Sequence, residues 1–374
     1  MNSLAPKSDF LNLEGVTHLA AGGQTPPLRV HQAALERFLH AKGTGMRGHA
    51  LNLETRARAA DRVAQLIGCQ ADDVGFSSSV AHAVTLIAES MDWQPGDNVV
   101  MEQWEFPSLL NPWLALRERG VEVRLLQPEG WRAPLERVRA EVDERTRVLA
   151  LSQVSYLTGE RHDLEAYASI AHDAGAILLV DSSHALGAVS IPSEHADFVV
   201  SCCYKWVLGV QGVAVTYWNR RRLPEWRPRS TGWHSSPSIM PLERGRANDA
   251  LATGIVFEPG NPSFAGIYLL DSSLEYLLSY GIEAIERHVV ALNGELRWRV
   301  AELGLPVMTP EEPAQRAGNV SFSADDAPRI RAALEAEGVL VTGEDGRVRI
   351  STHLYNDLAD VERGVEVLAK VVKA

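Results

Sequence analysis

Ala176-Ile177-Leu178-Leu179-Val180-Asp181 is an apolar run that ends in a carboxylate, and Ser182-Ser183-His184 follows it. A second run, Val199-Val200-Ser201-Cys202-Cys203-Tyr204-Lys205-Trp206, carries a lysine between two aromatic residues. Short, continuous apolar runs bounded by polar residues are typical of strands that are buried on both faces of a sheet. We therefore expect Asp181 and Lys205 to lie near the ends of two buried strands.

Similar apolar runs alternate with amphipathic stretches along the first two thirds of the chain. Strands are expected at 74–76, 98–101, 121–126, 148–151, 177–180, 198–200 and 213–217. Helices are expected between them at 80–91, 109–119, 134–142 and 163–174. This alternation predicts an α/β fold with a mostly parallel, seven-stranded sheet flanked by helices. Such sheets bind ligands beyond the carboxyl ends of their strands, where Asp181 and Lys205 are expected.

The alternation of apolar runs and amphipathic stretches changes after about residue 250. A helical pattern covers Gly266–Leu303, and strands at 318–322 and 347–350 alternate with helices at 327–337 and 358–371. These elements predict a smaller α+β domain, which the N-terminal segment completes. Because 374 residues suffice for two domains, we expect a large domain over residues 31–250 and a small domain over residues 1–30 and 251–374.

The composition indicates a globular protein whose main partner is neither nucleic acid nor a membrane. The formal net charge is −12, whereas nucleic acids and anionic membranes bind basic surfaces. The N-terminus lacks a signal-peptide pattern, and no apolar stretch approaches the ~20 residues needed to cross a bilayer. The three cysteines, Cys69, Cys202 and Cys203, show no disulfide or metal-site spacing. We expect Cys202 and Cys203 to be buried thiols and the protein to be cytoplasmic.

Asp181 and Lys205 together point to pyridoxal phosphate as a cofactor. The ring nitrogen of this cofactor needs an anion, and its aldehyde needs an amine. A desolvated lysine with a lowered pKa suits Schiff-base formation and can then transfer protons. His184 lies three residues beyond Asp181 and is a candidate to contact the phenolic oxygen of the cofactor. Taken singly, Asp181 is equally a helix cap and His184 a hydrogen-bonded core residue.

Three further places in the sequence offer contacts to the cofactor or the substrate. Ser79 and the amides of Val80 and Ala81 stand at a strand–turn–helix junction, which suits a phosphate, although serine capping alone is the alternative. Phe106 follows a strand and either stacks on the cofactor ring or packs in the core. Arg349 lies in a strand with apolar neighbours, where it binds a substrate carboxylate or forms a structural salt bridge.

These motifs, in this order, resemble the fold-type I pyridoxal-phosphate enzymes of the aminotransferase class V family, which includes cysteine desulfurases, kynureninases and isopenicillin N epimerase-like proteins. The segments that carry the resemblance are Val154-Ser155-Tyr156-Leu157-Thr158-Gly159, Asp181–His184, Tyr204-Lys205-Trp206 with Gly209 and Gly212, Phe257-Glu258-Pro259-Gly260-Asn261-Pro262, and Arg349-Ile350-Ser351 ahead of Tyr355-Asn356. The resemblance covers nearly the whole chain and implies the fold-type I architecture.

The resemblance implies a role for each candidate residue in the cofactor site. Lys205 would form the Schiff base, and Asp181 would pair with the pyridine nitrogen. His184 would contact the phenolic oxygen, Phe106 would stack on the ring, and Arg349 would bind the substrate carboxylate.

The resemblance also implies phosphate contacts and a second subunit. Ser79, the amides that follow it and Tyr204 would bind the phosphate. Val80 and Ala81 replace hydroxyl residues that are common in this loop, so the backbone amides would matter more. Trp233 and Asn261 resemble the elements that a partner subunit brings to the site, which implies a homodimer with two shared active sites.

Two departures from the family pattern bear on the reaction. Desulfurases of this family carry a nucleophilic cysteine on a loop shortly before the arginine, and residues 335–346 contain none. A persulfide relay is therefore not expected. Phe106 replaces the stacking histidine of the desulfurases and looks kynureninase-like, whereas Leu109 replaces an acidic residue that is usual in kynureninases.

Several reactions remain open. A lyase that breaks a Cβ–X bond of a free α-amino acid through an external aldimine is slightly favoured, either by C–S cleavage or by kynureninase-like hydrolysis. Transamination, epimerisation or racemisation, and cofactor binding without catalysis are the alternatives. The residues that line the substrate pocket are not fixed by the sequence, and the candidates are Trp104, Trp113, Trp233, His18, Gln24, Arg47, His49 and His234.

Overall fold

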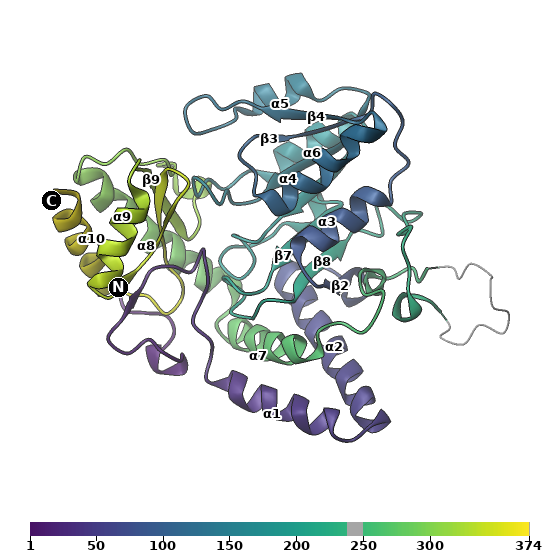
Figure 1. Ribbon diagram of the computed structural model, residues 1–374, viewed down its shortest axis with the longest axis horizontal. Helices are drawn as coiled ribbons and strands as arrows, with labels where there is room; N and C mark the ends of the chain where they lie inside the picture. The colour runs from purple at the N-terminus through teal and green to yellow at the C-terminus, as the bar shows by residue number, and fades with distance from the viewer. Residues whose placement is uncertain (238–249, 374) are drawn as a thin grey trace.

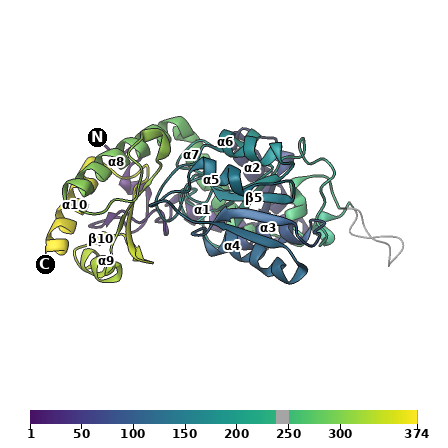
Figure 2. The same cartoon turned by 90° about the horizontal axis from the view of Figure 1, so that it is seen from above.

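The computed structural model describes residues 1–237 and 250–373. Figures 1 and 2 show a large unit built around one sheet and a smaller unit beside it. The smaller unit contains the N-terminal segment together with the last helices of the chain (Figure 1).

The sheet of the large unit has seven strands in the order β2-β8-β7-β6-β5-β3-β4. The neighbours from β7 to β4 run parallel, and β8 is antiparallel to both β7 and β2. The predicted mostly parallel, seven-stranded sheet is therefore confirmed. The strands are β2 (Val74–Ser77), β3 (Asn98–Glu102), β4 (Glu122–Leu126), β5 (Thr146–Ser152), β6 (Ile177–Asp181), β7 (Phe198–Cys202) and β8 (Ala214–Trp218).

Helices cover both faces of this sheet (Figure 2). One face packs against α3 (Val80–Glu89) and α4 (Pro107–Leu114). The other packs against α2 (Met46–Ile67), α5 (Leu135–Glu141), α6 (Leu164–Asp173) and α7 (Phe264–Tyr280). Helix α1 (Val30–Lys42) lies against α2 and α7.

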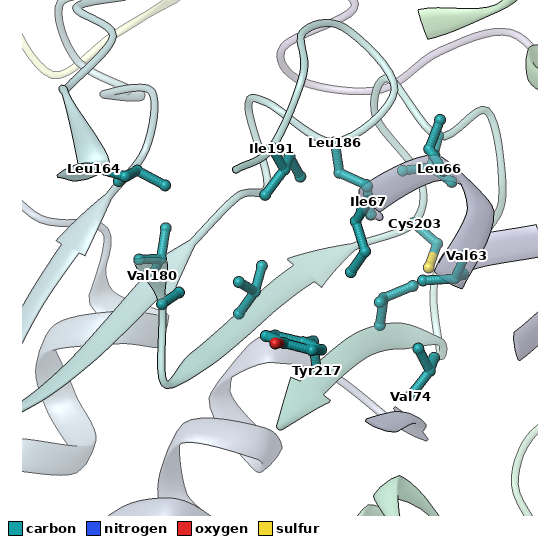
Figure 3. Close-up of a cluster of buried hydrophobic side chains, with 14 of the residues drawn as sticks. Val63, Leu66, Ile67, Val74, Leu164, Val180, Leu186, Ile191, Cys203 and Tyr217 are labelled. Carbon is teal, nitrogen blue, oxygen red and sulfur yellow. The ribbon is translucent and has the colours of Figure 1, made fainter. Parts of the chain in front are cut away.

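Burial on both faces explains why the strand sequences are continuously apolar. In β6, Leu178 and Val180 belong to the hydrophobic cluster on the α2 side, whereas Leu179 belongs to the cluster on the α3 side. Figure 3 shows part of the first cluster, where Ile67 of α2 points toward the sheet. Because side chains alternate between the two faces, each position of β6 must be apolar until the strand ends at Asp181.

The smaller unit is an α+β arrangement, as the sequence predicts. Its antiparallel sheet has the order β11-β12-β9, and the N-terminal segment adds a strand that pairs with β10. Ala20 also forms a bridge to Ser351 at the end of β12. The elements are β1 (Thr17–His18), α8 (Ile282–Glu302), β9 (Asn319–Ser323), α9 (Ala327–Ala336), β10 (Val339–Leu340), β11 (Thr342–Glu344), β12 (Arg347–Ser351) and α10 (Leu358–Lys373).

The helical pattern predicted over Gly266–Leu303 is divided in the structure. It breaks at Gly281, where φ is 80°, so that α7 and α8 are separate helices. A positive φ of this kind suits glycine and ends α7. Helix α7 packs in the hydrophobic cluster of the large sheet. The division of the chain into domains at residue 250 stays a prediction. Within the described residues, none of the helices combines the length and apolar character that crossing a bilayer requires.

Candidate active site

A cavity opens at the carboxyl ends of the central strands, as expected for a parallel sheet. It brings together the ends of β5, β6 and β7 and the start of α3, which lie far apart in the sequence. The residues that line it are Ser78, Ser79, Val80, Phe106, Ser108, Ser152, Tyr156, Asp181, Ser183, His184, Cys202, Tyr204, Lys205, Gln211, Gly212 and Val213.

Asp181 is the last residue of β6 and is buried. Its Oδ1 accepts a hydrogen bond from the backbone amide of Ser183 at 2.8 Å, and no cation among the described residues forms an ion pair with it. Burial raises the pKa of Asp181. A positively charged ring nitrogen beside this carboxyl would favour its ionised form, which is the partner that the pyridine nitrogen of pyridoxal phosphate needs.

Lys205 and His184 face one another across the cavity floor. Lys205 Nζ lies 2.9 Å from His184 Nε2, and both side chains are buried. Burial lowers the pKa of the Lys205 amine. Burial, followed by the charges of Lys205, Arg349 and Arg347, also holds the pKa of His184 well below its usual value. A buried, neutral amine is the form that attacks an aldehyde.

The start of α3 provides the place expected for a phosphate. The side chain of Ser79 accepts a hydrogen bond from the amide of His82 at 3.1 Å, so it caps the helix. Ser79 and Val80 line the cavity, whereas Ala81 contributes no lining atoms. Backbone amides at a helix N-terminus bind anions, and this one faces the same cavity as Lys205. Tyr204 lines the cavity as well.

Aromatic rings form one wall of the cavity. Phe106 lies edge-on to Tyr156 with ring centroids 5.2 Å apart, and 39% of Phe106 is exposed. Lys205 Nζ lies 5.6 Å from the centre of the Phe106 ring. A half-exposed ring this close to the amine suits stacking on an aromatic cofactor better than it suits core packing.

Arg349 lies at the far side of Tyr156, on β12 of the small sheet. Its Nη1 donates to the carbonyl oxygen of Tyr156 at 2.7 Å, and Arg347 Nη2 donates to the same oxygen at 3.4 Å. Arg349 is buried, yet its Nε has no partner among the described residues. Burial, together with the charge of Arg347, lowers the pKa of Arg349 to about 9, so the group is still a cation at neutral pH.

Trp233 and Asn261 do not reach the cavity of their own chain. Trp233 is 43% exposed and lies near His49 of α2, with ring centroids 6.4 Å apart. Asn261 lines a neighbouring hollow, which shares Gly212 and Val213 with the cavity. Their assignment to the site of a partner subunit therefore stays a prediction.

Several residues of the site were not named as candidates from the sequence, and several candidates lie elsewhere. Ser152, Tyr156 and Gln211 line the cavity, and Asn319 donates from its side chain to His184 Nδ1 at 2.9 Å. Cys202 is a buried thiol, as predicted, and it also lines the cavity. The residues that the sequence offered as pocket lining, none of which lines this cavity, are Trp104, Trp113, Trp233, His18, Gln24, Arg47, His49 and His234.

The donor set fits pyridoxal phosphate. The cavity combines a buried amine, a buried carboxyl without a cation, a helix N-terminus and an exposed aromatic ring. These four groups match the aldehyde, the ring nitrogen, the phosphate and the ring face of that cofactor.

Comparisons with known proteins agree with this assignment. The aminotransferase class-V family model matches residues 18–363. A protein named "Probable cysteine desulfurase" from Methanothermobacter thermautotrophicus is 28% identical over 400 residues, covering 98% of this chain and 97% of that protein. The apo structure of a cysteine desulfurase from Thermococcus onnurineus NA1 covers 100% of both chains with a TM-score of 0.88 and 22% identity.

A second solved structure is the complex of the cystine C–S lyase C-DES with its reaction product, cysteine persulfide. It has a TM-score of 0.86 at 19% identity and covers 96% of this chain and 99% of that one. At these identities, the two structures establish the fold. With the family match over most of its length, the chain belongs to the aminotransferase class-V family of pyridoxal-phosphate enzymes.

Proposed function

We propose that this enzyme breaks a Cβ–X bond of a free α-amino acid, with a C–S bond favoured, and that it does so without a cysteine persulfide relay. The observation that carries the proposal is the position of its thiols. Cys203 is fully buried, Cys202 is held at the end of β7, and Cys69 lies in the loop after α2. Burial raises the pKa of all three thiols, so none is a ready nucleophile.

Each residue of the site would have a separate role in such a reaction. Pyridoxal phosphate, when bound, supplies an electron sink for the negative charge that develops at Cα. Lys205 takes the Cα proton as a free amine, with His184 against it to fix its position. Arg349 binds the substrate carboxylate with the guanidinium atoms that the protein leaves free.

Cleavage of the Cβ–X bond leaves the electron pair with X, and the proton lost from Cα balances the charge of the leaving group. Water then converts the remaining three-carbon unit into pyruvate and ammonia. For cysteine the sum is hydrogen sulfide, pyruvate and ammonia. A C–S bond is favoured because C-DES, a structural neighbour, is named as a cystine C–S lyase.

The test is to supply amino acids to the cofactor-loaded enzyme in the absence of any keto acid. L-Cysteine, L-cystine and L-kynurenine are suitable probes, and pyruvate, alanine and sulfide are the products to measure. Pyruvate or alanine without an amino acceptor is the expected result. Turnover only when a keto acid is added would assign a transaminase. Exchange of the Cα proton alone would assign an epimerase. No turnover of any amino acid would assign a protein that binds the cofactor without catalysis.

We also propose a homodimer that shares its two active sites. Large hydrophobic residues are exposed along α1 and α2, including Leu39 at 57% and Met46 at 79%. Trp233 adjoins this face through His49, so a second copy that covers α1 and α2 would also approach an element expected in the site. An apolar face of this kind is typical of a permanent interface.

Light scattering should give twice the mass of one chain, and Met46→Glu should reduce it. The variant Lys370→Glu, at an exposed position of α10, is the control that should remain dimeric. A wild-type protein with the mass of one chain would contradict the proposal. The unpaired thiols Cys69, Cys202 and Cys203 suit a reducing compartment, and we propose the cytoplasm, which cell fractionation would test.

A further inference from the structure

A chain of three buried hydrogen bonds runs from the small sheet to the amine of Lys205. The hydroxyl of Ser351 donates to Asn319 Oδ1 at 2.8 Å, and Asn319 Nδ2 lies 2.9 Å from His184 Nδ1. His184 Nε2 in turn lies 2.9 Å from Lys205 Nζ. All four residues are buried. The chain therefore connects β12 and β9 of one sheet with the segments that follow β6 and β7 of the other.

We propose that Asn319 is a positioning residue, which holds His184 in the tautomer with its proton on Nε2, so that Lys205 accepts a hydrogen bond and stays a free amine. The inference deepens the proposed function and rests on it, because it explains how the catalytic amine is kept ready to act. It makes the small sheet a participant in the protonation state of Lys205, although the hydrogen bond to the amine comes from His184.

The orientation of the Asn319 amide follows from its surroundings. In the observed orientation, the Ser351 hydroxyl finds its acceptor in Asn319 Oδ1, and a flipped amide would leave that hydroxyl without one. A Cβ atom built on Gly22 would lie 2.7 Å from Asn319 Oδ1, 2.7 Å from Ser351 Oγ and 2.9 Å from Arg349 Nε. The three atoms therefore lie close together. The positive guanidinium of Arg349 favours the carbonyl oxygen of the Asn319 amide, rather than its NH2 group, at this position.

The tautomer of His184 follows from this orientation. An imidazole nitrogen that faces an N–H donor must be the acceptor, so Nδ1 carries no proton when Asn319 donates to it. The pKa of His184 is held well below its usual value by burial and by the nearby cations, so the ring is neutral. Its one proton is therefore on Nε2, which points at Lys205.

The tautomer of His184 determines which of two protonation states is favoured for Lys205. An Nε2–H group donates to the lone pair of a neutral amine, whereas a bare Nε2 would accept from an ammonium and favour the charged form. Burial and the charge of Arg349 on β12 lower the pKa of Lys205, whereas the charges of Cys202 on β7 and Asp181 on β6 raise it. A free amine condenses with an aldehyde and removes a proton, and an ammonium does neither.

The experiment exchanges the donor for an acceptor at the same place. In Asn319→Asp, the carboxylate accepts from His184 Nδ1–H, so the proton moves and Nε2 becomes an acceptor for Lys205. The full-length protein, freed of cofactor, is mixed with pyridoxal phosphate at a series of pH values, and the rate of appearance of the visible cofactor band is recorded. The midpoint of this profile should rise by at least one pH unit in Asn319→Asp and by less in Asn319→Ala.

The matched control tests whether Asn319 acts only through packing. Asn293 donates from its side chain to the backbone oxygen of Asn319 at 2.7 Å. It forms no hydrogen bond to Ser351 or His184 among the described residues. Asn293→Ala should leave the midpoint unchanged. An equal shift in Asn293→Ala and Asn319→Asp would overturn the proposal, and so would an unchanged midpoint in Asn319→Asp.

A second measurement reads the tautomer directly and needs no turnover. In protein labelled with ¹⁵N-histidine, the resonances of His184 are assigned by their loss in His184→Gln. The wild type should show the proton on Nε2, and a proton on Nδ1 would end the proposal even if Asn319→Asp fails to fold. Because neither readout uses the reaction product, an enzyme that makes neither pyruvate nor alanine would refute the lyase assignment and leave this inference standing.

Discussion

The two ends of the active site differ in how many of their hydrogen-bonding groups find a partner within the protein. At the cofactor end, Lys205 and His184 bond to each other, and Asp181 accepts from the amide of Ser183. At the substrate end, Arg347 and Arg349 share one carbonyl oxygen, and the Nε of each has no partner among the described residues. Arg347 also pairs with Asp345 at 3.4 Å, whereas no carboxylate among the described residues forms an ion pair with Arg349. A buried cation without a counter-charge is costly. The cofactor end is therefore assembled by the protein, whereas the end that we propose for the substrate keeps donors free for an anion.

This comparison predicts that changes at the cofactor end act on chemistry. Lys205→Ala removes the amine and should reduce turnover by at least about 10³-fold, because both carbonyl capture and proton transfer depend on it. Product formation with L-cysteine measures the loss, and borohydride should no longer fix the cofactor to the chain. Lys370→Ala, at an exposed surface lysine, should retain full activity. Comparable activity in Lys205→Ala would remove the basis of the comparison.

Asp181→Asn tests the same end with a smaller change. The asparagine oxygen can still accept from the Ser183 amide, but the negative charge beneath the cofactor is gone. We expect kcat to fall about 100-fold, which corresponds to a loss of about two pKa units of interaction with the charged partner, at about 1.4 kcal/mol each. KM for the amino acid should change little. A raised KM with an unchanged kcat would place Asp181 at the substrate end.

Arg349→Gln tests the substrate end, where binding should suffer more than chemistry. Loss of a buried, charge-assisted partner for the carboxylate should raise KM by up to about 100-fold. The absorbance of the bound cofactor should not change. Arg347→Gln is the matched comparison, because it keeps Arg349 and removes the weaker contact to Tyr156. An equal effect of both changes would mean that the two arginines act as one site.

The smallest effect is expected for Glu105, and it concerns stability rather than activity. Its carboxylate accepts from the amide and the hydroxyl of Ser152, both at 2.6 Å. Burial, with the nearby charge of Glu102, raises the pKa of Glu105 to about 7. The pKa of this carboxyl is higher in the folded state than in the unfolded chain, where it is about 4.5. The group therefore stabilises the folded state below pH 4.5, and this contribution to the free energy of unfolding is lost as the pH rises from 4.5 to 7.

Glu105→Gln should therefore flatten the dependence of Tm on pH between 4.5 and 7. The upper limit of the effect is about 3 kcal/mol at 1.36 kcal/mol per pH unit. His162 provides a contrast, since burial lowers its pKa, but the charge and hydrogen bond of Glu102, the charge of Glu160 and the Ser152 carbonyl together raise the pKa to about 9. Its contribution is present below pH 6.5 and is lost toward pH 9, so it should persist in Glu105→Gln. An unchanged Tm profile in the variant would refute the assignment.

The large sheet was predictable because its strands are buried on both faces and read as continuous apolar runs. The smaller strands were not, since β1, β10 and β11 have only two or three residues and carry no period. The break at Gly281 was also hidden, because apolar residues continue with helical spacing on both sides of it. A single glycine inside such a pattern is compatible with either one helix or two.

The cofactor end of the site could be predicted, whereas its supports could not. Asp181 and Lys205 follow apolar strands, so their position at one edge of the sheet follows from topology. Asn319 stands 135 positions from His184 and begins a strand of a different sheet. Only the packing of the two sheets brings them together, and no local pattern encodes that packing.

Helix α8 also belongs to both units. Ile285 and Val289 pack in the cluster of the large sheet, and Leu292, Leu296 and Val300 pack in the cluster of the small one. The helix is thus a spacer of fixed length between the two clusters. One alanine inserted after Val289 would advance its second half by about 1.5 Å and turn it by about 100°. Such an insertion changes no residue of the site, yet it would separate the amine of Lys205 from the guanidinium that we propose to hold the same amino acid.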